Sequence, residues 1–269
     1  MSTRKSVAGM LTPARTLVVT SVVGIIVALL SLMVVQAASR PAHAASDRLP
    51  DLGMTRFKAV QTQRTDDGRR LLRFSSIIVN VGAGRLELRG WRPGTGTNTM
   101  KVKQRIYNGA GGYRDARTGA VMYFAGGRDG DDGHHHWHVR NLQKFKLMRL
   151  DNGRKVGTIA KHGFCFFDNY RYGSNRAPFY TAARGACGDS SSDLRVRMGL
   201  SRGWGDIYRW NLPGQYINIT RRSPGRYRLK GLADPAGWFR EKNNANNSTW
   251  VNIQLARHGV RVLKHGPSA

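Results

Sequence analysis

The stretch Gly133-His134-His135-His136-Trp137-His138 places four of the chain's eight histidines within five residues. A glycine- and aspartate-rich turn precedes it, and the residues that follow alternate in polarity, which predicts a β-strand. On a strand, His134, His136 and His138 project from one face, with successive Cα atoms about 6.5–7 Å apart, while His135 and Trp137 point the other way. Imidazoles arranged in this way favour a metal site, although imidazole alone suits copper, zinc, iron or nickel.

The rest of the sequence is typical of a mainly β protein. Short alternating segments recur between glycine-containing turns, and no helical periodicity is present outside the N-terminal 44 residues. We therefore expect a single antiparallel β-sandwich domain with short strands and long loops. The segment of residues 71–80 and the segment Arg85 to Trp91 flank the turn Asn80-Val81-Gly82-Ala83-Gly84, which predicts that the two pair as a hairpin.

The N-terminus has the features of a secretory signal. Three basic residues precede an apolar run from Leu17 to Ala38, and Ala42-His43-Ala44 offers a small-x-small cleavage site. This pattern predicts a signal peptide over residues 1–44 and an exported domain over residues 45–269. The apolar run is long enough that an uncleaved membrane anchor is the alternative. Either reading places the domain outside the cytoplasm, secreted or at the cell surface.

The two cysteines, Cys165 and Cys187, both lie in the expected exported domain. An even pair in an oxidising compartment is most simply a disulfide bond. The alternative is a copper–thiolate site, which the histidine cluster makes unnecessary.

The chain is strongly basic, with a net charge of +28. Residues 1–44 contribute four of those charges and no acid, so the remainder carries +24. Such a charge favours a polyanionic partner, and an anionic cell-wall polymer is one candidate. A general arginine bias in the proteome is the other explanation. The basic residues are scattered along the sequence, which argues against a specific nucleic-acid site.

From Leu72 onward, the sequence resembles the catalytic domain of the lysyl oxidase (protein-lysine 6-oxidase) family in its bacterial or archaeal form. The resemblance extends in order over several segments. They are Leu72-Arg73-Phe74-Ser75, Asn80 with Gly82, Leu86-Glu87-Leu88, His134 to His138, Lys161-His162-Gly163-Phe164-Cys165 with Asp168, and Gly203-Trp204-Gly205-Asp206-Ile207-Tyr208. The C-terminal segments are Pro213-Gly214-Gln215 with Ile217-Asn218-Ile219-Thr220, Gly225-x-Tyr227-x-Leu229, Asp234-Pro235, Glu241 and the Asn246-Asn247 region.

The resemblance implies a copper amine oxidase with a cofactor made from its own side chains. His134, His136 and His138 would be copper(II) ligands, and Lys161 and Tyr208 would combine into lysine tyrosylquinone. The implied reaction converts peptidyl lysine or another primary amine to an aldehyde, with release of ammonia and hydrogen peroxide.

Asp206 lies two residues before Tyr208 and would share its strand face. It would then orient the cofactor or act as the base, whereas the structural alternative is an aspartate that caps a turn. Animal members have a further histidine after the copper segment, proposed as the catalytic base, where this chain has Lys144 and Lys146. The identity of the base is therefore open, as is the register of the histidines, because His135 could replace His134.

Two other functions remain open from the sequence. One is a non-catalytic exported copper-binding or wall-associated β-sandwich that never forms the quinone. The other is an exported polyanion-binding module, which would need basic and aromatic residues interleaved on one face.

Overall fold

The computed structural model describes residues 46–126 and 135–269, and for residues 160–162 it describes the backbone alone. These residues form two antiparallel sheets and one short 3-10 helix, η1 (Ala182–Arg184). The expected mainly β, sandwich-like domain is therefore confirmed. Within the described residues, no helix has the length and apolar character that crossing a bilayer would require.

As far as the chain is described, the larger sheet has ten strands: β1 (Asp47–Arg48), β5 (Leu86–Trp91), β6 (Thr99–Asn108), β7 (Tyr113–Ala125), β8 (His136–Arg149), β9 (Lys155–Phe164), β11 (Arg195–Leu200), β14 (Gly225–Ala233), β15 (Ser248–Ala256) and β16 (Gly259–His265). The smaller sheet has six: β2 (Leu52–Met54), β3 (Lys58–Arg64), β4 (Arg70–Asn80), β10 (Tyr170–Arg171), β12 (Trp204–Tyr208) and β13 (Tyr216–Asn218).

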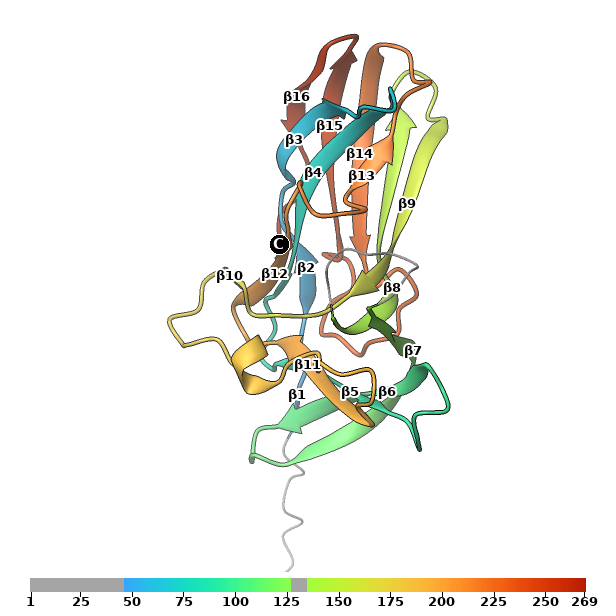
Figure 1. The fold of residues 1–269 in the computed structure, drawn as a ribbon. Helices are drawn as coiled ribbons and strands as arrows, with labels where there is room; N and C mark the ends of the chain where they lie inside the picture. The colour runs from blue at the N-terminus through green and yellow to red at the C-terminus, as the bar shows by residue number, and fades with distance from the viewer. Residues whose placement is uncertain (1–45, 127–134) are drawn as a thin grey trace, which may run out of the picture. The chain divides into compact units, whose positions relative to one another are not determined.

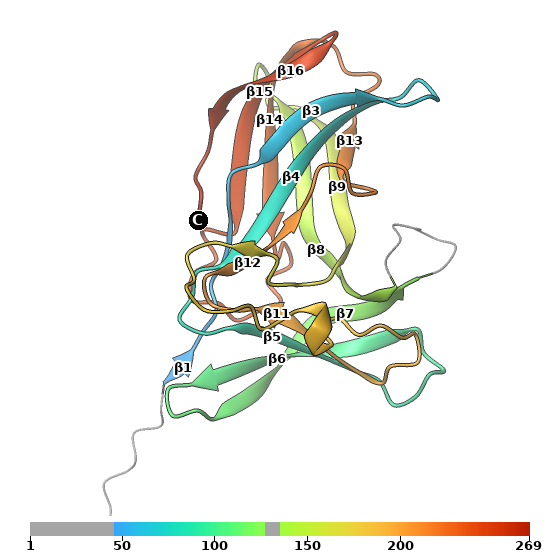
Figure 2. The same ribbon diagram turned by 60° about the vertical axis from the view of Figure 1, so that its left-hand side comes forward.

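The long strand β8 connects the two parts of the larger sheet. Its first residues pair with β7, its last residues pair with β14, and β9 lies along its other edge. In both ribbon views, β3 and β4 of the smaller sheet lie over β14 and β15, while β5, β6, β7 and β11 form a separate layer below (Figures 1 and 2). His136 and His138 lie at the start of β8, where its pairing with β7 begins.

The core between the sheets is rich in aromatic side chains. Phe74 of β4 and Phe57, which lies between β2 and β3, pack edge-on with ring centroids 5.3 Å apart. The ring centroid of Phe145 of β8 lies 4.8 Å from that of Phe74. All three are almost completely buried. Edge-to-face contacts of this kind stabilise by about 0.5–1.5 kcal/mol beyond the burial of apolar area. The aromatic cluster therefore fixes β4 against β8.

The expected hairpin between residues 71–80 and Arg85 to Trp91 is wrong. Strand β5 pairs with β6 and β11 in the larger sheet, and β4 belongs to the smaller one. The reason is that both edges of β4 are already occupied at its end, by β2 (Gly53 opposite Val79) and by β12 (Gly205 opposite Val79). The glycine turn instead lets the chain pass in close contact with the backbone of residues 48–51. A Cβ at Gly84 would lie 1.8 Å from the carbonyl oxygen of Arg48, so only glycine fits there.

A buried carboxylate, Glu87 of β5, joins β5 and β6 of the larger sheet to the loop that contains Tyr180. It accepts hydrogen bonds from Tyr180 Oη (2.8 Å), Tyr107 Oη (2.9 Å) and Arg89 Nε (2.7 Å). Burial raises the pKa of Glu87, but these three hydrogen bonds together outweigh it and hold the pKa below its usual range. Glu87 therefore stabilises the folded state as an anion.

We expect Glu87→Gln to lower the free energy of unfolding by about 1–3 kcal/mol at pH 7. All three partners of Glu87 are hydrogen-bond donors, and the amide NH₂ group of glutamine cannot accept from them. The folded-state pKa is lowered, so the anion's contribution is present above the unfolded pKa of about 4.5 and is lost as the pH falls through the folded value. In urea unfolding measured between pH 7 and pH 3, the free energy of unfolding of the variant should fall less on acidification than that of the wild type. Asp66→Asn, an exposed turn carboxylate, is the control, and equal pH profiles for wild type and Glu87→Gln would contradict the assignment.

Candidate functional site

The start of β8 presents two histidines on one face, as the sequence predicts. The Nε2 atoms of His136 and His138 lie 2.8 Å apart, and the rings meet edge-on with centroids 4.6 Å apart. Trp137 points to the opposite side, where it is fully buried, and its indole N–H donates to the carbonyl oxygen of Ser190. His134 lies outside the described residues, and His135 is exposed just before the strand.

The two imidazoles fit a shared metal ion. Two nitrogens that are each about 2.0 Å from one ion lie roughly 2.8–3.3 Å apart for bond angles near 90–110°. Imidazole is also a donor that copper accepts well. The same separation suits a hydrogen bond between neutral rings. In the described part of the chain, no group of three or more metal-ligating side chains occurs.

The ring of His138 packs closely against the backbone of a glycine, Gly163. This ring is only 2% exposed and packs edge-on against Tyr123 of β7, 5.9 Å between centroids. A Cβ at Gly163 of β9 would lie 2.2 Å from His138 Nδ1 and 2.4 Å from Tyr123 Oη. Glycine at position 163 therefore leaves the space in which the His138 ring lies. Sequence reasoning did not single out Gly163 or Tyr123.

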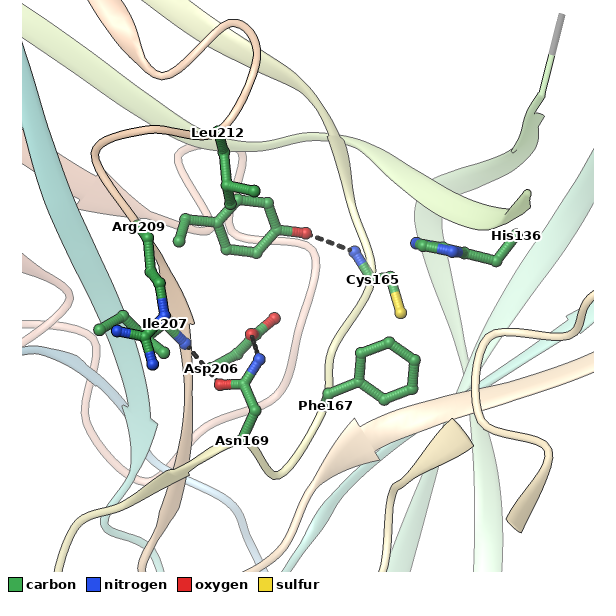
Figure 3. Close-up of a pocket in the computed structure, with 9 residues that line it drawn as sticks. His136, Cys165, Phe167, Asn169, Asp206, Ile207, Arg209 and Leu212 are labelled. Carbon is green, nitrogen blue, oxygen red and sulfur yellow. Dashed lines mark hydrogen bonds between the residues drawn. The ribbon is translucent and has the colours of Figure 1, made fainter. Parts of the chain in front are cut away.

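A pocket of about 270 Å³ lies beside His136. Figure 3 shows His136 entering from one side and Asp206, Asn169 and Arg209 from the other. Its other lining residues are Cys165, Phe167, Ile207, Tyr208 and Leu212. The pocket therefore combines an imidazole, a carboxylate, a phenol and a guanidinium, contributed by β8, β12 and their flanking loops.

Tyr208 is nearly buried at the end of β12, 4% exposed. The backbone N–H of Cys165 donates to its hydroxyl oxygen at 3.1 Å, and its ring stacks on Phe164 with centroids 4.2 Å apart. Phe164 is the last residue of β9, and Cys165 follows it directly. Lys161 belongs to the same strand, opposite Gln143 of β8 and four residues before Cys165. The placement of its side chain lies outside what the structure describes.

Asp206 lies on β12 opposite Ile78 of β4 and is 1% exposed, so it is a strand residue and not a turn cap. Asn169 Nδ2 donates to Asp206 Oδ1 at 2.6 Å, while Asn169 Oδ1 accepts from the backbone N–H of Ile207 at 2.8 Å. Asn169 thus fixes the Asp206 carboxylate in the pocket. No sequence motif pointed to Asn169, because it follows a strand in an irregular segment.

The expected disulfide is confirmed: Cys165 and Cys187 are bonded, with Cα atoms 5.9 Å apart. This pairing overturns the copper–thiolate alternative. The bond also connects two parts of the site. Cys165 donates to Tyr208, and the carbonyl oxygen of Cys187 accepts from the backbone N–H of Trp137 at 2.8 Å, between the two histidines.

Asp168 holds the loop that follows the disulfide's first cysteine. Its buried carboxylate accepts hydrogen bonds from the backbone N–H groups of Phe179 (2.8 Å), Tyr180 (3.0 Å) and Ser201 (2.8 Å). Asp168 therefore has a structural role. It positions the neighbouring Asn169 and the edge of the pocket.

Comparisons with known proteins point to one family. The lysyl oxidase family model matches residues 129–264, just over half of the chain. The chain is 25% identical over 196 residues to lysyl oxidase homolog 3A of Danio rerio, covering 73% of this chain and 21% of that protein. It is 27% identical over 203 residues to lysyl oxidase homolog 2 of Bos taurus, covering 75% and 20%.

A third relative is protein-lysine 6-oxidase of Gallus gallus, 30% identical over 127 residues, with 46% of this chain and 27% of that protein covered. The chain thus spans about a fifth of the length of the first two of these curated relatives. The matched region includes β8, β9 and β12, which carry the histidine pair, Lys161 and Tyr208. This chain belongs to the lysyl oxidase family.

Proposed function

We propose that this protein is an exported, copper-dependent amine oxidase. Its substrate would be peptidyl lysine or another primary amine, converted with O₂ and water to an aldehyde, ammonia and hydrogen peroxide. Family membership supports amine oxidation in general. The observation that carries the finer proposal is the convergence of His136, Tyr208 and Asp206 on one pocket beside the end of β9, the strand that contains Lys161.

In this proposal, His136 and His138 hold copper(II), with His134 as the third ligand. Lys161 and Tyr208 form lysine tyrosylquinone. Once formed, this cofactor supplies an electrophilic carbonyl and accepts two electrons from the substrate amine. The hydrogen bond from Cys165 and the stack on Phe164 hold the Tyr208 ring in one orientation, which supports a reaction at a defined ring position.

Asp206 is the carboxylate among the described residues that line the pocket. We assign it the proton-handling or orienting role, because Asn169 fixes one of its oxygens and leaves the carboxyl group directed at the pocket beside Tyr208. A buried, preorganised carboxylate is suited to accept a proton from substrate carbon. Phe167 and Leu212 contribute apolar walls that limit the access of water.

Export follows, in this proposal, from the signal-like residues 1–44, with residues 45–269 as the working domain. The disulfide between Cys165 and Cys187 supports an oxidising compartment.

The experiment that tests the function is a peptide map by mass spectrometry. The protein is loaded with copper in air and trapped with phenylhydrazine. We expect a hydrazone-bearing crosslink between the peptides that contain Lys161 and Tyr208. Two separate, unmodified peptides from fully copper-loaded protein would reject the oxidase and leave the histidines as a binding site alone, which is the non-catalytic alternative.

A further inference from the structure

The basic residues that are scattered along the sequence become adjacent in the larger sheet. Arg197 of β11 lies directly opposite Arg89 of β5, Arg89 opposite Lys103 of β6, and Lys103 opposite Arg117 of β7. Residues directly opposite on antiparallel strands project from the same face. Four cations therefore form one row across four neighbouring strands, about 14–15 Å long at the usual spacing between strands.

A second row lies beside the first on the same face. Arg195 of β11 is opposite Trp91 of β5, which is opposite Lys101 of β6. Trp91 is a large exposed aromatic, with 45% of its surface accessible. An aromatic side chain thus lies between two cations and next to the row of four. We call these two rows, seven residues in all, the basic face.

Acidic side chains compensate the basic face only in part. Asp115 of β7, which pairs with Arg105, also interacts with the charges of Arg89 and Lys103. Arg89 pairs with Glu87, and Arg197 lies over the ring of Phe179. Among the described residues, no ion pair forms on the remaining four cations, which are Lys101, Lys103, Arg117 and Arg195. Like charges directly opposite one another destabilise a sheet. The arrangement therefore costs stability that a bound polyanion would restore.

We infer that the basic face binds an acidic polysaccharide that carries a carboxylate on its sugar rings. Charge complementarity supports an anionic chain, because one cation stands on each of four strands about 4.8 Å apart. A pyranose residue in an extended glycan spans a similar length, so the carboxylates of a bound chain recur at a spacing comparable with that of the cations. Trp91 offers an apolar surface on which one sugar ring can stack.

The two rows are less suited to single-stranded nucleic acid. Proteins of that class stack successive bases on successive aromatic side chains along a basic groove. Here, the rows contain one aromatic residue, Trp91, among six cations. The anionic cell-wall polymer expected from the net charge would thus be a glycan held on this face.

The test measures binding of purified polygalacturonate to the full chain by isothermal titration calorimetry at several salt concentrations. We expect Lys103→Glu with Arg117→Glu to weaken binding about tenfold or more at low salt and to reduce the salt dependence. The matched control is Arg257→Glu with Arg261→Glu, which makes the same charge change at exposed positions around the β15–β16 turn and should change affinity only slightly. Trp91→Ala should weaken binding without changing the salt dependence.

Two results would overturn the inference. If both double variants weaken binding equally, the contact is nonspecific attraction and the basic face is not the site. If poly(dT) or polyglutamate binds as tightly as polygalacturonate with the same loss in Lys103→Glu with Arg117→Glu, the partner is not a polysaccharide. Circular dichroism of each variant confirms that the loss of binding is not loss of folding. Because none of these residues lines the Tyr208 pocket, failure here leaves the proposed oxidase untouched.

Discussion

A chain that carries Tyr208→Phe should form no phenylhydrazine adduct, and its amine-dependent release of hydrogen peroxide should fall to background. Phenylalanine keeps the ring and the stack on Phe164 but lacks the oxygen from which a quinone is made. Copper binding should be retained, because His136 and His138 are unchanged. Peroxide release and adduct absorbance measure the activity, and copper content by atomic absorption separates loss of the cofactor from loss of the metal.

The same substitution has a predicted effect on stability. It removes the acceptor for the buried N–H of Cys165, which lies 3.1 Å from Tyr208 Oη. An unsatisfied buried donor costs about 1–3 kcal/mol, measurable by urea unfolding. Tyr107→Phe is the matched control, since it deletes a hydrogen bond of similar length to Glu87 away from the pocket. Peroxide release from Tyr208→Phe at the level of Tyr107→Phe would contradict the role of Tyr208.

A complementary variant distinguishes the contribution of the metal-binding histidines from that of Tyr208. His138→Ala keeps Tyr208 and its hydrogen bond but removes one of the two converging imidazoles. In the proposed function, this protein has lower copper content and no crosslink. A crosslink in metal-depleted His138→Ala would show that the histidines are dispensable for cofactor formation.

Much of the fold could be predicted because alternating polarity reports burial on strands. Residues 71–80 were expected as a strand and lie in β4, and the residues from His136 onward were expected as a strand and begin β8. Strand partners could not be predicted in the same way. The hairpin of β4 with β5 failed because β2 and β12 compete for the edges of β4, and such competition between distant segments leaves no local pattern.

The site could be predicted where spacing itself carries information. Histidines at alternate positions predicted that His136 and His138 share one face of a strand, and the presence of two cysteines predicted the disulfide. Asn169 and Gly163 could not be found, since their roles depend on a carboxylate and an imidazole brought from other strands. The basic face was missed for the same reason. Its cations are distant in sequence and meet only through strand register.

The disulfide gives the second large expected effect, because Cys165 and Cys187 each hold a different part of the site. One donates to Tyr208, and the other accepts from the N–H between the two histidines. We expect Cys165→Ala with Cys187→Ala to lose about 3 kcal/mol of stability, as chain-entropy estimates give for a loop of this size (22 residues of separation). Chemical unfolding measures this loss.

If the disulfide had a structural role alone, only stability would fall, but the geometry predicts that the yield of the crosslink falls as well. Without the bond, the Tyr208 ring and the histidine segment are no longer held at a fixed separation, so the yield of crosslink should fall even at temperatures where the variant stays folded. Leu255→Ala is the control, because this fully buried β15 residue should cost a comparable 2–5 kcal/mol away from the pocket. If both variants retain wild-type crosslink yield when folded, the disulfide serves stability only. If the cysteine variant alone loses it, the bond positions the two halves of the site.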